Sequence, residues 1–164
     1  MDRCRNIDAI DISISGCSLL LVAAFLMTVA SPLHARERDP FAYTLKLTPE
    51  EGRVDPAIQR RYTPQLAACQ KRSEITSRIA ACFEAEFQRQ EATLNREWRA
   101  ALNRVPRQMH DRLLLAQRKW IADRDPFCRA ATDGFEGGTI VPIIYSNCRA
   151  EVTIRRTMWL EKLR

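Results

Sequence analysis

The feature that most constrains this chain is a long stretch without helix-breaking residues. No proline occurs between Pro64 and Pro106, and no glycine occurs between Gly52 and Gly134. Within this stretch apolar side chains recur at steps of three or four, which places them on one face of an α-helix. The stripe, with Gln90 as its one polar position, consists of Ile79, Phe83, Phe87, Gln90, Leu94, Trp98, Ala101 and Val105. This spacing predicts a helix over about residues 77–104.

The same spacing predicts three further helices. A short one covers about residues 65–71, and Thr76 is the expected N-cap of the long helix that follows. Pro106 fits the first turn of the next helix, which Pro126 is expected either to kink or to divide by starting a new turn. The last helix is predicted over about residues 142–163. Because no convincing run of period two remains, we expect an all-α fold: a small, elongated bundle of three main helices plus a short N-terminal helix.

The N-terminal region is typical of an export signal. Residues 12–33 carry no charge, and the strongly apolar part, residues 19–30, is 12 residues long. That length suits the core of a signal peptide better than a membrane span. Cleavage is predicted after Ala35, with cleavage after Ala30 or retention as an inner-membrane anchor as alternatives. We therefore expect residues 1–35 to be a signal peptide and the protein to be periplasmic or secreted.

The region after this signal is predicted to have two parts. Residues 36–62 are charged and contain three prolines, so we expect an extended or partly disordered arm. Within it, Thr48–Pro49 and Asp55–Pro56 can each start a short helical turn, because both place a capping residue before proline. Residues 63–164 are predicted to form the helical domain.

Cysteine usage predicts two disulfides. Beyond the signal the cysteines are Cys69, Cys82, Cys128 and Cys148. An even number in a small exported domain favours disulfides, and the predicted helices bring all four to one end of the bundle. Three connectivities are then possible, and we favour Cys69–Cys82 with Cys128–Cys148 because each clips one helix–loop–helix unit. A zinc site is the alternative, but the spacings contain no CxxC pair, so no metal or other cofactor is expected.

Little in the sequence favours catalysis. His110 is the one histidine beyond the signal, and no nucleotide-binding glycine pattern occurs. The carboxylate pairs Glu84/Glu86 and Asp123/Asp125 are two residues apart, so their members lie on different sides of a helix. We therefore expect a binding protein and not an enzyme.

Several motifs together are similar to one known family. They are Cys69, Thr76, Ile79 and Cys82, then Leu94–Asn95, the run Ala116–Gln117–Arg118–Lys119–Trp120–Ile121 with Arg124, Asp125 and Cys128, and finally Cys148, Thr153, Arg156 and Leu160. Over about residues 65–163 they resemble the LprI-type lysozyme inhibitor domain, a family of exported bacterial helical proteins. The resemblance implies a protein that inhibits a lysozyme or a related cell-wall hydrolase by non-covalent blocking.

A polar cluster on the last two predicted helices has two interpretations. It consists of Gln117, Trp120, Arg124, Asp125, Thr153 and Arg156. We favour a buried hydrogen-bonded network that sets helix register, with Arg124 or Arg156 forked onto a carboxylate. The alternative is a partner-binding patch, for which Arg124 and Arg156 are the candidates.

The predicted loop between the last two helices is a second candidate contact. Residues 133–139 contain three glycines, and such a loop can present Phe135 and Glu136 to a partner. The alternative is a plain connector.

Charge supports a competing function. The chain has 22 Arg, 4 Lys and a net charge of +6. A basic envelope-associated module could bind anionic glycan or a lipid surface without inhibiting anything. The resemblance implies a strongly basic lysozyme as partner, and two cationic proteins lose electrostatic steering.

Nucleic acid is not an expected partner, since the chain is exported and has no recognised motif. The sequence indicates no oligomeric state.

Overall fold

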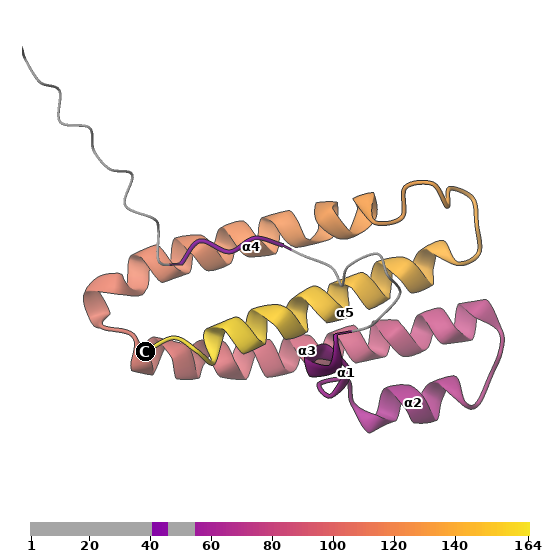
Figure 1. Ribbon diagram of the computed structural model, residues 1–164, viewed down its shortest axis with the longest axis horizontal. Helices are drawn as coiled ribbons and strands as arrows, with labels where there is room; N and C mark the ends of the chain where they lie inside the picture. Colours follow the sequence, from indigo (N-terminus) through magenta and orange to yellow (C-terminus); the bar gives the residue numbers. More distant parts are fainter. Residues whose placement is uncertain (1–40, 46–54) are drawn as a thin grey trace, which may run out of the picture. The chain divides into compact units, whose positions relative to one another are not determined.

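The computed structural model describes residues 41–45 and 55–164, and in these ranges the fold is all-α, as predicted (Figure 1). The predicted signal peptide and the predicted turn at Thr48–Pro49 lie outside the described residues. The elements are α1 (Pro56–Gln59), α2 (Pro64–Gln70), α3 (Thr76–Arg104), the 3₁₀ turn η1 (Arg107–Met109), α4 (His110–Ala130) and α5 (Val141–Leu160). None of these helices has both the length and the hydropathy that crossing a bilayer requires.

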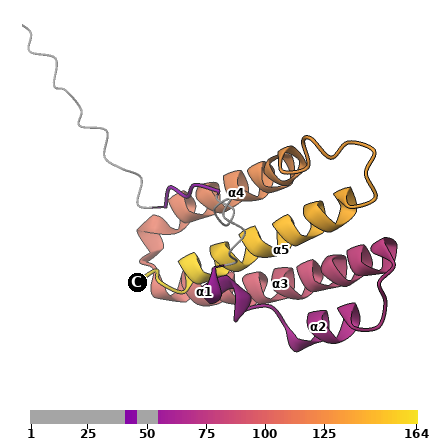
Figure 2. The ribbon, with the colours of Figure 1, turned by 45° about the vertical axis from the view of Figure 1, so that its right-hand side comes forward.

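Three long helices carry the core. Figures 1 and 2 show α3 and α5 running in the same direction, with α4 connecting them in the opposite direction. The apolar face of α3 packs against α5, and Leu94 and Ala101 of α3 are buried in the same core as Val152 and Leu160 of α5. Removing these side chains from water is the main driving force for the bundle.

Both predicted disulfides are confirmed. Cys69–Cys82 joins α2 to α3, and Cys128–Cys148 joins α4 to α5. The two loops that they close lie at the same end of the helices (Figures 1 and 2). Each crosslink restricts the unfolded chain, which stabilises the fold by about 3 kcal/mol in the chain-entropy description.

Two local predictions were wrong, and one of two alternatives at a third position is excluded. Thr76 is not a cap, because α3 begins at this residue and Ile75 takes the N-cap position. Pro106 precedes η1 and is not in the first turn of α4, which begins at His110. Of the two alternatives at Pro126, division of the helix is excluded, because α4 continues through this residue to Ala130. Proline lacks an N–H, so one carbonyl in the preceding turn loses its helical donor there, and the exposed position leaves that carbonyl accessible to water.

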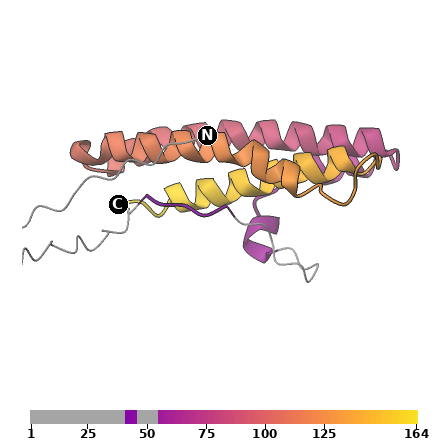
Figure 3. The same cartoon turned by 90° about the horizontal axis from the view of Figure 1, so that it is seen from above.

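Residues before α2 also pack against the bundle. The expected turn at Asp55–Pro56 is present as α1, where Asp55 Oδ1 accepts a hydrogen bond from the Ala57 N–H at 2.8 Å. Ile58 is buried against α5. Residues 41–45 are not helical and lie beside α5, as Figure 3 shows in a view from above.

Candidate functional site

Arginines and aromatic rings alternate along the interface of α3, α4 and α5. The guanidinium of Arg149 lies 4.4 Å from the Tyr145 ring centroid and 4.1 Å from that of Phe87. Arg124 lies 4.8 Å from Phe87 and 5.5 Å from Trp120. Arg156 lies 5.8 Å from Trp120, 5.2 Å from Tyr43 and 4.0 Å from Trp159. We call this array the arginine–aromatic ladder, and each contact is within the range of a cation–π interaction.

Two of the three guanidiniums are neutralised by carboxylates. Arg149 pairs with Glu84. Arg124 pairs with Glu91, and its Nε also donates to Asp125 Oδ1 at 2.9 Å. Burial lowers the pKa of Arg124, but its two carboxylates outweigh this effect and raise the pKa above its ordinary value. The charges of these two arginines are therefore neutralised within the domain, although Arg149 Nε is buried without a hydrogen-bond partner among the described residues.

Arg156 differs from the other two ladder arginines in its partners. Its side chain is 0% exposed, yet no carboxylate in the described part of the chain pairs with it. Its Nε donates to Gln117 Oε1 at 2.8 Å, while Nη1 and Nη2 have no hydrogen-bond partner among the described residues. Burial lowers the pKa of Arg156 to about 10, so the guanidinium still carries its charge at neutral pH.

Further unpartnered donors lie on the same two helices. Trp120 Nε1 on α4, and Arg149 Nε and the Thr153 hydroxyl on α5, are buried without a hydrogen-bond partner among the described residues. The Trp120 ring centroid lies 5.8 Å from the Arg156 guanidinium, and Thr153 precedes Arg156 by about one helical turn on α5. A buried polar atom without a partner costs about 1–3 kcal/mol, so this concentration of donors is a site that favours an acceptor.

Residues 41–45 cover this donor-rich region; we call them the strap. Phe41 is buried, Tyr43 and Leu45 are half-buried, and Ala42 and Thr44 are exposed, so alternate side chains point inward. Phe41 and Tyr43 make edge contacts with Trp159, at centroid distances of 6.4 Å and 6.0 Å. The strap thus lies on the guanidinium of Arg156.

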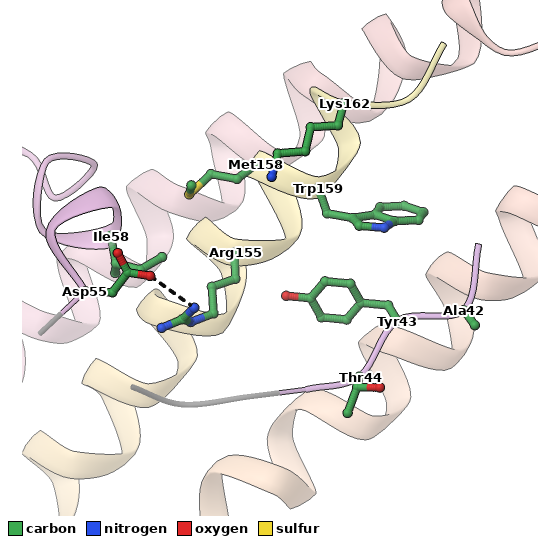
Figure 4. Close-up of a pocket in the computed structure, with 9 residues that line it drawn as sticks. All are labelled: Ala42, Tyr43, Thr44, Asp55, Ile58, Arg155, Met158, Trp159 and Lys162. Carbon is green, nitrogen blue, oxygen red and sulfur yellow. Dashed lines mark ion pairs between the residues drawn. The ribbon is translucent and has the colours of Figure 1, made fainter. Parts of the chain in front are cut away.

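A hollow lies on each side of the strap. The first, of about 440 Å³, is lined by residues that include Tyr43, Asp55, Arg155, Trp159 and Lys162, as Figure 4 shows. Asp55 and Arg155 form an ion pair across it at 3.5 Å. The second, of about 210 Å³, lies toward α4 and includes Tyr43, Ala116 and Trp120. Ala42 and Tyr43 line both hollows, so the strap lies between them. We call the two hollows, together with the surface beneath Tyr43 where Arg156 lies, the α4–α5 groove.

The α4–α5 loop is a separate surface. Phe135 is 50% exposed and Ile140 is 45% exposed. Gly134 and Gly137 have φ values of +88° and +75°, which glycine adopts without strain. Glu136 Oε1 accepts from the Gly134 N–H at 2.9 Å, and this hydrogen bond lowers the pKa of the Glu136 carboxyl. The Cys128–Cys148 disulfide closes the base of the loop.

Comparison with known proteins identifies the domain. The family model for the lysozyme inhibitor LprI matches residues 67–160. This chain belongs to the LprI family. It is also 34% identical over 97 residues to an uncharacterised protein of Rhizobium meliloti (strain 1021). The aligned region covers 50% of this chain and 68% of the relative. No solved structure matches the chain.

The LprI match contains both disulfides and every ladder residue except Tyr43. The strap lies outside it. The ladder is therefore part of the family domain, whereas its cover at Arg156 comes from a preceding segment of this chain.

The residues predicted for the site fall into three places. Arg124 and Arg156 lie on either side of Trp120, and Arg124 forms its ion pairs inside the bundle. Phe135 and Glu136 lie on the α4–α5 loop, and no hydrogen bond, ion pair or cation–π contact joins them to those arginines in the described ranges. The four residues predicted for the polar network, Gln117, Trp120, Asp125 and Thr153, all lie beside the ladder.

Sequence reasoning missed several participants. Tyr43 was not singled out, although the alternation of Phe41, Tyr43 and Leu45 is a short period-two signal. Arg149 lies seven residues before Arg156 on α5, a spacing that places both on one helical face. In the described ranges no cluster of His, Cys, Asp and Glu is arranged to hold a metal ion.

Proposed function

We propose that this protein is an exported inhibitor of a lysozyme or a related cell-wall hydrolase, and that it acts by non-covalent blocking and not as an enzyme. The observation that carries this proposal is the match of residues 67–160 to the LprI family. In this proposal residues 1–35 are a signal peptide cleaved after Ala35, and the mature protein is periplasmic or secreted. The arm of residues 36–62 then precedes the inhibitory domain.

The α4–α5 loop is the surface best suited to enter a hydrolase cleft. Its backbone is held by internal hydrogen bonds, including Phe135 N–H to Thr132 O at 3.1 Å and Gly138 N–H to Phe135 O at 2.9 Å. A preorganised loop loses little conformational freedom on binding. Phe135 supplies an exposed aromatic anchor of the type that dominates interface energies.

A positive charge beside this loop also favours binding to a hydrolase cleft. Arg129, at the end of α4, is exposed and has no ion pair among the described residues. It lines a hollow of about 360 Å³ together with Pro142 and Tyr145. Lysozyme-type clefts contain two carboxylates, so one arginine at the rim provides local attraction even though the chain is basic overall. Glu136 is engaged with the loop backbone, and its role in this proposal is to hold Phe135 in place.

A turbidity assay tests the proposal. The purified, oxidised protein is added to c-type lysozyme acting on a peptidoglycan suspension, and we expect lysis to slow. Phe135→Ala should weaken inhibition about tenfold or more, the usual effect of losing a central aromatic anchor. Ile121→Ala is the matched control, because Ile121 on α4 is also 50% exposed. Full lytic activity at micromolar excess of the protein would overturn the proposal for that enzyme.

The net charge of +6 favours a second candidate function. A basic module that binds anionic envelope glycan or lipid would sediment with envelope material at low salt and be released at high salt, because ions screen exposed charges. It would leave lysozyme activity unchanged. Salt-dependent sedimentation combined with no effect on turbidity would therefore favour this alternative over inhibition.

A further inference from the structure

The α4–α5 groove contains a charge that the domain does not neutralise. Of the three ladder arginines, Arg149 and Arg124 have carboxylate partners, whereas Arg156, which is fully buried, has none in the described ranges. Among the described residues, neither of its N–H₂ groups has a hydrogen-bond partner, and neither do Trp120 Nε1 and the Thr153 hydroxyl. Burying a guanidinium with only one of its three nitrogens hydrogen-bonded is costly, so this site is suited to a ligand that supplies an acceptor for the other two.

Residues 42–45 of the strap are held over this site by side-chain contacts. Residues 42–45 make no hydrogen bond to any helix in the described part of the chain. Their attachment depends on the aromatic contacts of Tyr43 and on apolar burial next to Phe41. Residues 42–45 can therefore be exchanged for another extended segment without breaking a hydrogen bond to a helix.

We propose that the α4–α5 groove binds an extended peptide segment of a partner protein through a side-chain carboxylate on Arg156, and that the strap is a displaceable occupant of the same groove. The site lies away from the loop that carries Phe135 (Figure 1). The proposal therefore does not depend on the inhibition of a hydrolase.

The shape of the groove specifies an extended peptide. The strap already shows how such a segment fits, because its first, third and fifth side chains point inward. Its third residue, Tyr43, lies over Arg156 at 5.2 Å from ring centroid to guanidinium. A glutamate at that third position would bring its carboxylate to Nη1 and Nη2, where a bidentate, charge-assisted pair is the strongest available contact.

The same reasoning argues against a second copy of this chain as the occupant. The strap sequence, Phe-Ala-Tyr-Thr-Leu, contains no acid, so the strap of another copy would leave Arg156 as unpaired as its own strap does. An acidic segment of a different protein satisfies both the groove and the charge.

Peptide binding to the full-length protein tests the proposal. The probe is a capped, dye-labelled peptide with the sequence of residues 41–45 carrying Tyr43→Glu, and its control carries Tyr43→Gln. The protein carries Phe41→Ala and Tyr43→Ala, which weakens its own strap. By fluorescence anisotropy we expect the acidic probe to bind this variant about tenfold or more tightly than the neutral control does. Wild-type protein should bind the acidic probe more weakly than the variant, because its strap competes.

Arg156→Met in the strap-weakened protein should abolish the difference between the two peptides. Free glutamate at the same concentration should not displace the acidic probe, since it lacks the flanking apolar anchors. Equal affinity for both peptides, or displacement by free glutamate, would overturn the proposal.

A second measurement does not require Arg156 to be replaced. In the full chain, Tyr43→Glu places a carboxylate over Arg156, whereas Tyr43→Gln removes the same ring without adding a charge. We expect the Tyr43→Glu protein to melt at a higher temperature than the Tyr43→Gln protein at neutral pH. An equal or lower melting temperature for Tyr43→Glu would show that Arg156 does not accept a carboxylate.

Discussion

The substitution Glu86→Gln tests the main polar anchor between α2 and α3. Glu86 is 0% exposed. Its Oε1 accepts from the Thr63 N–H at 3.0 Å and from Gln90 Nε2 at 2.7 Å. Its Oε2 accepts from the Thr63 hydroxyl and from Arg89 Nε at 3.0 Å. Every acceptor position of this buried carboxylate is therefore in use.

The size of the destabilisation follows from the hydrogen bonds of the Glu86 carboxylate that a glutamine amide cannot accept. An amide oxygen in the place of Oε1 keeps two hydrogen bonds, but the amide nitrogen then faces Arg89 Nε, which is also a donor. The charge-assisted contacts of Oε2 with Arg89 Nε and Nη2, both at 3.0 Å, are lost, while Nε keeps the Thr63 hydroxyl as an acceptor at 3.1 Å. Losing these contacts to a buried carboxylate destabilises the fold by about 3 kcal/mol. For a domain of this size that loss lowers Tm by about 10 °C.

The pH dependence gives an independent check. Burial on its own would raise the pKa of the Glu86 carboxyl, but the hydrogen bonds from Thr63, Gln90 and Arg89 outweigh it and lower the pKa below its ordinary value. A lowered folded-state pKa adds stability above the unfolded-state pKa, and this stability is lost as the pH falls through the folded-state pKa. The stability difference between wild type and Glu86→Gln should therefore be largest near neutral pH and shrink below about pH 4.

Thermal unfolding monitored by circular dichroism from pH 3 to pH 7 provides the measurement. Glu97→Gln is the matched control on the same helix, because its partner Arg104 is partly exposed and also donates to the carbonyls of Leu160 and Leu163. The control should lower Tm by no more than about 3 °C, as expected for a partly exposed ion pair. A Glu86→Gln protein that melts within 2 °C of the control would refute the anchor argument.

Two further substitutions test the disulfide-closed end. Replacing Cys128 and Cys148 by serine should lower the free energy of unfolding in urea by about 3 kcal/mol, because the crosslink spans 20 residues; a loss below about 1 kcal/mol would contradict the entropic account. Gly137→Ala should cost about 1 kcal/mol because φ is +75°, with Thr139→Ala in the same loop as a neutral control; equal melting temperatures for the two variants would contradict it.

The fold was largely predictable because helical periodicity and loop length are local properties. The apolar stripe from Ile79 to Val105 lies within one element, α3, and its spacing alone predicts the buried face. The Cys69–Cys82 pairing was likewise predictable, since the residues lie on consecutive helices joined by a short connection. The wrong predictions occur at helix ends, where capping and 3₁₀ turns compete within one or two residues.

The ladder was not predictable because it depends on how three helices interdigitate. Phe87 contacts Arg124 and Arg149, which lie 37 and 62 residues further along the chain. Sequence spacing places each of these residues on a helical face, but it does not set the rotation of one helix against another. It also does not reveal which arginine receives a carboxylate, because Glu91 reaches Arg124 from a different helix.

Stability measurements on Arg156→Met distinguish a binding role from a structural one. If Arg156 served only to hold α4 and α5 together, its removal would destabilise the fold. The structure predicts otherwise, because methionine fills similar space and removes a buried charge whose Nη1 and Nη2 are unpartnered in the described ranges. Replacing a buried, poorly compensated charge by an apolar side chain is often neutral or stabilising by about 1–4 kcal/mol.

Arg124→Met is the matched control, because it strands the carboxylates of Glu91 and Asp125. We expect Arg156→Met to melt at or above the wild-type temperature and Arg124→Met to melt well below it. Equal destabilisation by both substitutions would show that the Gln117 hydrogen bond and the three ring contacts fully compensate Arg156. A stable Arg156→Met protein would instead mean that the domain keeps a charge that its own fold does not need, which is expected where an arginine is retained to bind a partner.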